Sequence, residues 1–302
     1  MKTQAVDVDM WMLYDRWVRE RHHVWEARQL GMPAPWSKWK MMNHKFTNIF
    51  RILDPGSQYA LDMLYDDAAT DRDRLARILL YRLTPNTTAW DWMRKQIGVF
   101  PTDSFIRSPG MPDLMHQCVQ ETGENVFGNA YLVYPGKEKG ADKIDSICGR
   151  VAGFMESKLA PQFLCAPSLR GQVRALMGFK GIGGFVAMQT ATEYNYGPWG
   201  HDWENEYILP GPGARRGASY LWPGMDAEQA TRRTWEIWRW ESEDAPTIFG
   251  RRNLSLMDVQ NTLCEFSKCV RYLKQAPAAP YRPAHPGAQK PPRLPAAWTL
   301  DK

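Results

Sequence analysis

The spacing of apolar residues predicts a chain built almost entirely of helices. Apolar side chains recur every three or four residues from about residue 10 to 25, 75 to 83, 144 to 154 and 256 to 270. This spacing places them along one face of an α-helix. The alternation of apolar and polar positions that would indicate β-strands is almost absent. We therefore expect an all-α fold.

Short end signals mark where several of these helices begin and stop. Thr70 and Asp73 stand three residues apart, as in a capping box, before an apolar stripe that ends at Thr84-Pro85. Ser255 and Asp258 repeat that spacing before the last stripe. Helices are therefore expected to begin directly after Thr70 and Ser255.

Two further segments are predicted from weaker patterns. Apolar residues at helical spacing from 42 to 53 predict a helix that stops at Asp54-Pro55-Gly56, because proline cannot continue it. Residues 98–140 are rich in glycine, proline and aspartate, so loops are expected there, apart from a short helix near 114–119.

A glycine-rich turn between two predicted helices has the form of a helix-hairpin-helix motif at about 168–195. The turn reads Met177-Gly-Phe-Lys-Gly-Ile-Gly183, and Ile182 would plug the two helices together. Glycines let the backbone turn tightly, and the N–H groups that open the second helix can hold a DNA phosphate. Lys180, Gly181 and Gly183 are the expected DNA contacts, and a simple packing turn is the alternative.

Carboxylates and a glycine-rich, arginine-bearing segment follow the hairpin. Asp202 and Glu204 lie in the acidic stretch 202–206, and the segment 210–217 reads Pro-Gly-Pro-Gly-Ala-Arg-Arg-Gly. We expect this segment to be a loop whose backbone N–H groups and arginines bind an anion. The residues assigned to that anion site are Gly211, Gly213, Arg215 and Arg216. A structural turn with solvated arginines is the alternative.

Composition narrows the class of protein only moderately. The 302 residues carry a formal charge of +5 and include 14 tryptophans, which suits a polyanionic partner without requiring one. The five cysteines form no CxxC pair, so neither a disulfide framework nor a zinc ribbon is expected, and a reducing cytoplasm is the expected compartment.

Several other classes are disfavoured by what the sequence lacks. It has no GxxxxGK[ST] phosphate loop, no HExxH and no histidine–cysteine cluster, so neither a P-loop kinase nor a metal site is expected. No apolar run approaches membrane-spanning length, and the polar start has no signal-peptide core. We expect neither secretion nor a membrane partner.

The C-terminal stretch differs in composition from the rest. Residues 276–302 are dominated by proline and alanine with scattered basic residues, which cannot form a packed core. We expect a helical domain over 1–275 and a disordered basic tail over 276–302.

Several sequence blocks together resemble a known family. They are Pro35-Trp-Ser37, Lys45-Phe-Thr-Asn-Ile-Phe-Arg-Ile-Leu-Asp54, the hairpin, Gly211–Gly217 and Leu263-Cys-Glu-Phe-Ser-Lys268. They resemble the alpha-glutamyl/putrescinyl thymine pyrophosphorylase family of bacteriophages over about residues 17–272. That family is similar to the helical domain of phage 5-hydroxymethyluracil DNA kinases and to helix-hairpin-helix DNA glycosylases.

The resemblance implies a fold and a reaction. It implies a helix-hairpin-helix, DNA-glycosylase-like helical fold. It also implies a transferase that uses DNA whose 5-hydroxymethyluracil a kinase has pyrophosphorylated, and that displaces pyrophosphate with a free amino acid, glycine being favoured. No cofactor is required, although Mg²⁺ could assist. The implied setting is the host cytoplasm during phage infection. Departures from the family pattern at Ser37-Lys38, Pro55 and Ser267 leave the amine open.

This reaction needs a base and a cation for the leaving group. Asp202 or Glu204 is the expected base for the incoming amine. Arg215 and Arg216 would stabilise charge that develops on pyrophosphate. Asp202 also follows the hairpin at about the distance of the catalytic aspartate in the glycosylases. Phe185 stands where bifunctional glycosylases carry their lysine, so lyase chemistry is not expected.

Three further residues are assigned to the base and amino-acid pocket. Trp203 would stack on an extruded base. Asn48 is expected to face the pocket from between apolar neighbours, and Arg51 to bind the amino-acid carboxylate. A structural ion pair between Arg51 and Asp54 is the alternative.

Two other functions fit the same motifs. A DNA glycosylase would use Asp202 to assist departure of a damaged base and would leave abasic sites. A non-catalytic DNA-binding module would accompany a kinase and show no turnover.

Overall fold

The computed structural model describes residues 6–128, 142–199, 201–250, 252–274 and 291–298, and no side chain of 241–244. Within these ranges the regular structure comprises 13 α-helices and three short 3-10 helices. The sole β-type pairing there is an isolated bridge between Ile248 and Arg252. The all-α prediction is therefore confirmed.

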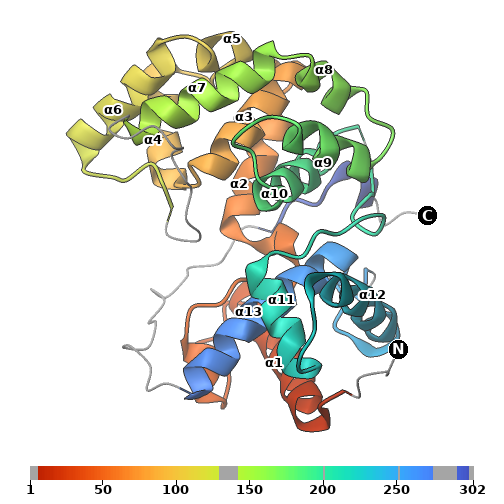
Figure 1. Cartoon of the computed structure of the whole chain (residues 1–302). Helices are drawn as coiled ribbons and strands as arrows, with labels where there is room; N and C mark the ends of the chain where they lie inside the picture. The colour runs from red at the N-terminus through yellow and green to blue at the C-terminus, as the bar shows by residue number, and fades with distance from the viewer. Residues whose placement is uncertain (1–5, 129–141, 200, 251, 275–290, 299–302) are drawn as a thin grey trace. The chain divides into compact units, whose positions relative to one another are not determined.

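The chain divides into two compact units, each described by itself. Unit 1 comprises Met1–Asp54, Tyr207–Arg293 and Leu300–Lys302. Unit 2 comprises Pro55–Glu206 and Leu294–Thr299. Unit 1 therefore combines segments from both ends of the sequence, whereas unit 2 is almost continuous (Figure 1).

Unit 1 is organised around its last long helix. Its helices are α1 (Val8–Gln29), η1 (Lys40–Asn43), η2 (Arg51–Leu53), α11 (Pro212–Leu221), α12 (Ala227–Asp244) and α13 (Leu256–Lys274). Helix α13 packs against α1, α11 and α12. Tyr14 of α1 stacks edge-on against Phe266 of α13, with ring centroids 5.2 Å apart, and both side chains are fully buried. The predicted apolar faces therefore form the core of this unit.

The helix expected over 42–53 is wrong. The backbone between η1 and η2 is not helical, although Phe46, Ile49 and Phe50 are buried as expected of apolar residues. Pro55 starts α2 (Pro55–Leu64) instead of stopping a helix, because its missing N–H is not needed at a first helical position. Side chains from α1 and α13 bond the backbone of this segment, as described below.

Unit 2 surrounds one buried helix. Its helices are α2, α3 (Asp71–Leu83), α4 (Thr87–Ile97), α5 (Asp103–Ile106), α6 (Gly110–Thr122), α7 (Lys143–Glu156), α8 (Leu159–Leu164), α9 (Leu169–Met177), α10 (Gly184–Tyr194) and η3 (Ala296–Trp298). Helix α3 packs against α2, α5, α7 and α10, and every residue from Leu75 to Leu83 is buried. Such all-round burial is expected of a central helix.

The predicted capping boxes are both present. Thr70 and Asp73 cap α3 reciprocally through side-chain and backbone bonds. The Ser255 N–H donates to Asp258 at 2.9 Å, and the Asp258 N–H donates to Ser255 Oγ at 3.0 Å.

The prediction of loops across 98–140 is wrong for α5 and for most of α6. Residues 129–141 lie outside the described part of the chain.

The end of the proline-rich stretch has a defined place in unit 2. Trp298 is 4% exposed and packs edge-on against Tyr196, with ring centroids 6.0 Å apart. The Ala296 N–H donates to the Tyr65 hydroxyl at 2.6 Å. The tail expected to be disordered therefore includes an ordered part at 291–298, while 275–290 and 299–302 lie outside the described residues.

Candidate functional site

The hairpin between α9 and α10 has the local geometry that its glycines predict. Gly181 adopts φ +96°, a conformation that glycine tolerates and L side chains rarely adopt. Ile182, in the turn between α9 and α10, is buried, and these two helices pack against each other, whereas Lys180, Gly181 and Gly183 are exposed. Gly183 is the N-cap of α10 and offers no capping side chain. The start of α10 is therefore a helix N-terminus of the kind that favours anions.

A basic side chain from another helix lies over this hairpin. A Cβ added at Gly181 would come within 2.8 Å of Arg150 Nε on α7. Exposed Arg174 on α9 and Lys180 add further positive charge to the same helix pair and its turn. This combination of cations and a helix N-terminus suits a phosphate backbone.

The expected Gly-Pro anion loop is wrong, because these residues form a helix. Gly211 is the N-cap of α11 and Pro212 its first residue. A Cβ at Gly213 would collide with Cys264 Sγ, and one at Gly217 with the Leu263 carbonyl oxygen. Both glycines, four residues apart, therefore serve close packing of α11 on α13. Close packing on α13 therefore accounts for a glycine at position 213, and no contact with a phosphate is needed to explain it.

The two arginines of this segment remain accessible. Arg215 and Arg216 lie on exposed positions of α11, in the turn that follows Gly211. A helix N-terminus with adjacent cations can attract an anion. Their expected role with pyrophosphate stays a prediction.

The expected carboxylates lie in unit 2, in the stretch after α10. Asp202 is exposed. Glu204 is 3% exposed and accepts a hydrogen bond of 2.6 Å from the Tyr196 hydroxyl. Trp203 is half-buried and stacks on His201, with ring centroids 4.0 Å apart. Glu204 is thus held by a neighbour, and the roles of all three with substrate stay predictions.

The segment Lys45–Asp54 of unit 1 is held from α1 by a buried arginine. Arg21 Nε donates to the Thr47 carbonyl at 2.8 Å, and its Nη2 donates to the side-chain oxygen of Asn48. Asn48 Nδ2 in turn donates to the Leu53 carbonyl at 2.8 Å. Asn48 is 7% exposed, so its side-chain amide is a buried link between Arg21 and the backbone of this segment.

Helix α13 holds the same segment from the other side. Glu265 Oε2 accepts the Thr47 N–H at 2.9 Å and the Lys268 ammonium at 2.7 Å. Asn261 Nδ2 donates to the Asn48 carbonyl at 3.0 Å, and Asp258 Oδ1 accepts the Arg51 N–H at 2.7 Å. Glu265 therefore connects the backbone of Thr47 to the side chain of Lys268.

Two carboxyls in this network have perturbed acidity. Asp54 accepts the Asn48 N–H at 2.7 Å, and burial of its carboxyl raises its pKa to about 7 against the opposing charges of Arg21 and Arg51. Burial also raises the pKa of Asp258 above its usual range, although Arg51 and Ser255 donate to it. A carboxyl poised near neutrality is typical of acid–base sites.

We call Arg21, Asn48, Arg51, Asp54 and Glu265 the unit 1 polar cluster. Sequence reasoning placed Asn48 and Arg51 in a pocket but gave Arg21, Asp54 and Glu265 no binding or catalytic role. The available signal was the run Lys45–Asp54, in which polar residues interrupt an apolar stripe.

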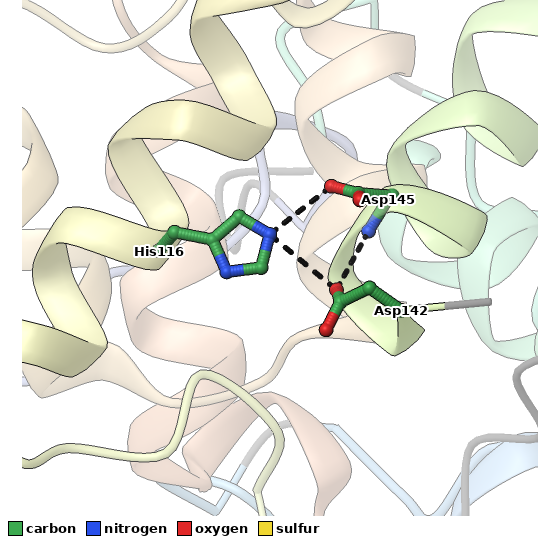
Figure 2. Close-up of side chains that lie close together, drawn as sticks. All are labelled: His116, Asp142 and Asp145. Carbon is green, nitrogen blue, oxygen red and sulfur yellow. Dashed lines mark hydrogen bonds and ion pairs between the residues drawn. The ribbon is translucent and has the colours of Figure 1, made fainter. Parts of the chain in front are cut away.

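One group among the described side chains has the composition of a metal site. Figure 2 shows His116 of α6 directed between Asp142 and Asp145 at the start of α7, with His116 Nε2 3.4 and 3.1 Å from their oxygens. Asp142 Oδ1 already accepts the Ile144 N–H at 2.7 Å as the helix N-cap, and all three side chains reach solvent. Capping and ion pairing account for these contacts.

Two smaller expectations concern cysteines and membranes. All five cysteines are free, in line with the prediction of no disulfide framework. Among the described helices, none combines the length and apolar character needed to cross a bilayer.

The chain matches one family model over most of its length. Residues 8–278 match the family described as "5-hmdU DNA kinase, helical domain". No curated protein and no solved structure matches the chain significantly.

Proposed function

Because this chain belongs to the family of the 5-hmdU DNA kinase helical domain, we propose that it is an amino acid:DNA transferase of thymine hypermodification. Its DNA substrate carries 5-hydroxymethyluracil that a kinase has pyrophosphorylated. The amine of a free amino acid replaces pyrophosphate on the exocyclic methylene. The related kinase supplies the substrate, so the two enzymes act in sequence during phage infection.

The family match over residues 8–278 is the observation that carries the proposal. That match connects the chain to the modification of hydroxymethyluracil in DNA. The sequence contains no GxxxxGK[ST] phosphate loop of its own. A helical protein of this family without that loop is suited to a step that consumes a phosphorylated base.

The hairpin supplies a reason to expect DNA as the partner. Exposed Lys180, Arg150 over Gly181 and the uncapped start of α10 converge on one turn of unit 2. Backbone phosphates bind such sites without regard to sequence. The modified base would be extruded to expose its methylene, since chemistry on a base requires room that the stacked duplex lacks.

The unit 1 polar cluster supplies a reason to expect an amino acid. It combines the guanidinium groups of Arg21 and Arg51 with the carboxyls of Asp54 and Glu265. A free amino acid carries one charge of each sign, so both kinds of group can bind it. A diamine such as putrescine would lack the carboxylate that an arginine binds.

Mass spectrometry of digested nucleosides tests the proposal. DNA that carries pyrophosphorylated 5-hydroxymethyluracil is incubated with the protein and pooled amino acids. A thymidine adduct with the mass of one amino acid is expected, and its mass identifies the amine. Unmodified nucleosides with intact DNA would contradict the transferase and favour a binding module. Abasic sites would contradict it and favour a glycosylase.

A further inference from the structure

We infer that unit 1 carries a binding surface for an unpaired DNA strand, on which cations hold the phosphates and an aromatic pair stacks on a base. The surface is formed by the residues just before Phe46 and by positions of α11 and α13. We call it the unit 1 basic surface, and its residues are His44, Lys45, Arg216, Lys268, Arg271 and Tyr272. The inference deepens the proposed function, because it names the form of the DNA partner and a contact site other than the hairpin.

The cations of this surface come from three segments that meet within unit 1. Lys268 Nζ on α13 donates to the Lys45 carbonyl at 3.2 Å, which connects the first two segments. Burial raises the pKa of the Cys264 thiol to about 11, and the charges of Lys268 and of Arg216 on α11 both oppose this rise. Both cations therefore lie near this thiol. Arg271 stands three positions after Lys268, on the same face of α13.

The positive charge of this surface is largely unopposed. Glu265 pairs with Lys268 at 2.7 Å. Lys45, Arg216 and Arg271 are exposed, and none of the three forms an ion pair with a described carboxylate. Like charges that lie close together repel one another, so bound anions would stabilise this arrangement. The phosphates of a nucleic acid strand supply such anions at regular spacing.

An aromatic pair lies beside these cations. The rings of His44 and Tyr272 pack with centroids 4.6 Å apart, and both side chains are half-buried. The Arg271 guanidinium lies 5.8 Å from the centre of the Tyr272 ring, and buried Phe46 packs against the same ring. Aromatic side chains next to cations bind unpaired bases by stacking, whereas the bases of a duplex are already stacked on one another. The pair therefore favours an unpaired strand.

An unpaired strand also suits chemistry on a base. Enzymes that modify a base either act on single-stranded DNA or extrude the base from a duplex. A surface that binds unpaired DNA stabilises the opened form of the substrate, so it shifts the equilibrium toward that form. An acidic peptide would offer carboxylates to the cations but no base for the aromatic pair, so DNA fits both features of the surface.

Fluorescence anisotropy with a labelled oligothymidylate, measured on the whole chain at several salt concentrations, tests the cations. Lys45→Ala and Arg271→Ala should each weaken binding roughly fivefold and reduce the salt slope by about 0.7, the value per phosphate of a single strand. Arg232→Ala removes an exposed arginine from α12 of the same unit and should match the wild type. Wild-type binding by Lys45→Ala and Arg271→Ala, or an equal loss in Arg232→Ala, would overturn the inference. Polyglutamate that displaces the oligonucleotide at equal charge concentration would also overturn it.

The aromatic pair has its own readout. Tyr272→Leu removes the ring but keeps an apolar side chain, so it should weaken oligothymidylate binding roughly fivefold or more and leave duplex binding unchanged. Tyr272→Phe keeps the ring and should bind as the wild type does. Circular dichroism melting curves establish that each variant is folded. Equal losses of Tyr272→Leu on both DNAs, or no loss on either, would overturn the assignment of an unpaired strand.

Cross-linking locates the strand without any substitution. Oligothymidylate in which 5-iodouracil replaces thymine cross-links on irradiation to aromatic side chains that stack on it, and mass spectrometry identifies those side chains. Cross-links at His44 or Tyr272 are expected, and cross-links confined to unit 2 would overturn the inference. Binding is measured without turnover, so a protein that binds the strand here but transfers no amino acid would refute the proposed function alone. Transfer without binding at this surface would refute the inference alone.

Discussion

Glu193 on α10 accepts a hydrogen bond of 2.7 Å from Nη2 of Arg82 on α3, and both side chains are buried in the interior of unit 2. Ser57 Oγ on α2 donates to the same carboxylate oxygen at 3.1 Å. Three helices therefore meet at one buried charge. Such a pair fixes the packing of α10, the helix that follows the hairpin at Gly178–Gly183.

Removal of this carboxylate should destabilise the protein strongly. Glu193→Ala leaves the Arg82 guanidinium buried without its counter-charge, and breaking a buried pair in this way costs about 3–5 kcal/mol. Urea unfolding followed by circular dichroism measures the loss. The control is Glu156→Ala, whose exposed pair with Arg107 should contribute less than about 1 kcal/mol. Equal losses in both variants would refute a structural role for the buried pair.

The close contact between α11 and α13 predicts that a methyl group added at Gly217 destabilises the protein. Gly217→Ala places a Cβ against the Leu263 carbonyl, which belongs to the backbone and cannot move aside. The free energy of unfolding should therefore fall by roughly 1–3 kcal/mol. Gly149→Ala on α7 meets no atom within 4 Å and should be neutral or stabilise its helix. Thermal unfolding compares the two variants. A Gly217→Ala protein as stable as the wild type would show that the helices are not so close.

Asp54 predicts a specific pH dependence of stability. The folded protein keeps the Asp54 proton up to about pH 7, whereas the unfolded chain releases it near 3.8, so the folded state binds more protons between these values. The contribution of Asp54 to the free energy of unfolding therefore falls as pH rises from about 4 to 7, by roughly 1–3 kcal/mol. Asp54→Asn should lack this contribution. Urea titrations at several pH values compare the two slopes, and parallel slopes would count against a raised pKa.

The hairpin predicts a salt-dependent contact with DNA. Lys180→Ala should weaken binding to duplex DNA roughly fivefold and reduce the salt slope by about one. Lys95→Ala removes another exposed lysine, from α4, which packs against α6, and should leave both quantities unchanged. Fluorescence anisotropy at several salt concentrations measures them. Equal effects of the two substitutions would indicate general electrostatic attraction instead of a hairpin contact.

The helix bounds that the sequence predicts best belong to segments with both a long apolar stripe and local end signals. Helix α3 has a stripe, a capping box and a following proline, and these agree with each other. The segment 42–53 has the stripe without such an ending, because Pro55 is as acceptable at a helix start as after a helix end. Periodicity alone could not distinguish a helix from irregular backbone with buried apolar residues.

The Gly-Pro segment was misinterpreted for a related reason. Glycines usually indicate loops, yet Gly213 and Gly217 are four residues apart and therefore lie on one helix face. That spacing was the available sign of a close helix contact. The identity of the partner helix, α13, depends on tertiary packing that no local pattern reports.

The unit 1 polar cluster could not be predicted from local sequence patterns. Thr47 and Glu265 are separated by 218 residues, and Arg51 and Asp258 by 207. Residue types alone suggested Arg51 as a carboxylate ligand, but the raised pKa of Asp54 depends on burial that only the assembled unit provides.

The central claim, transfer of an amino acid to modified DNA with loss of pyrophosphate, is tested most directly by a stoichiometry. Pyrophosphate release and incorporation of a nitrogen-15-labelled amino acid are measured in one reaction on the same pyrophosphorylated DNA. The account predicts one pyrophosphate released for each labelled thymidine adduct and no release when the amino acid is omitted. Release that continues at the same rate without an amino acid, with no label in the DNA, would contradict it.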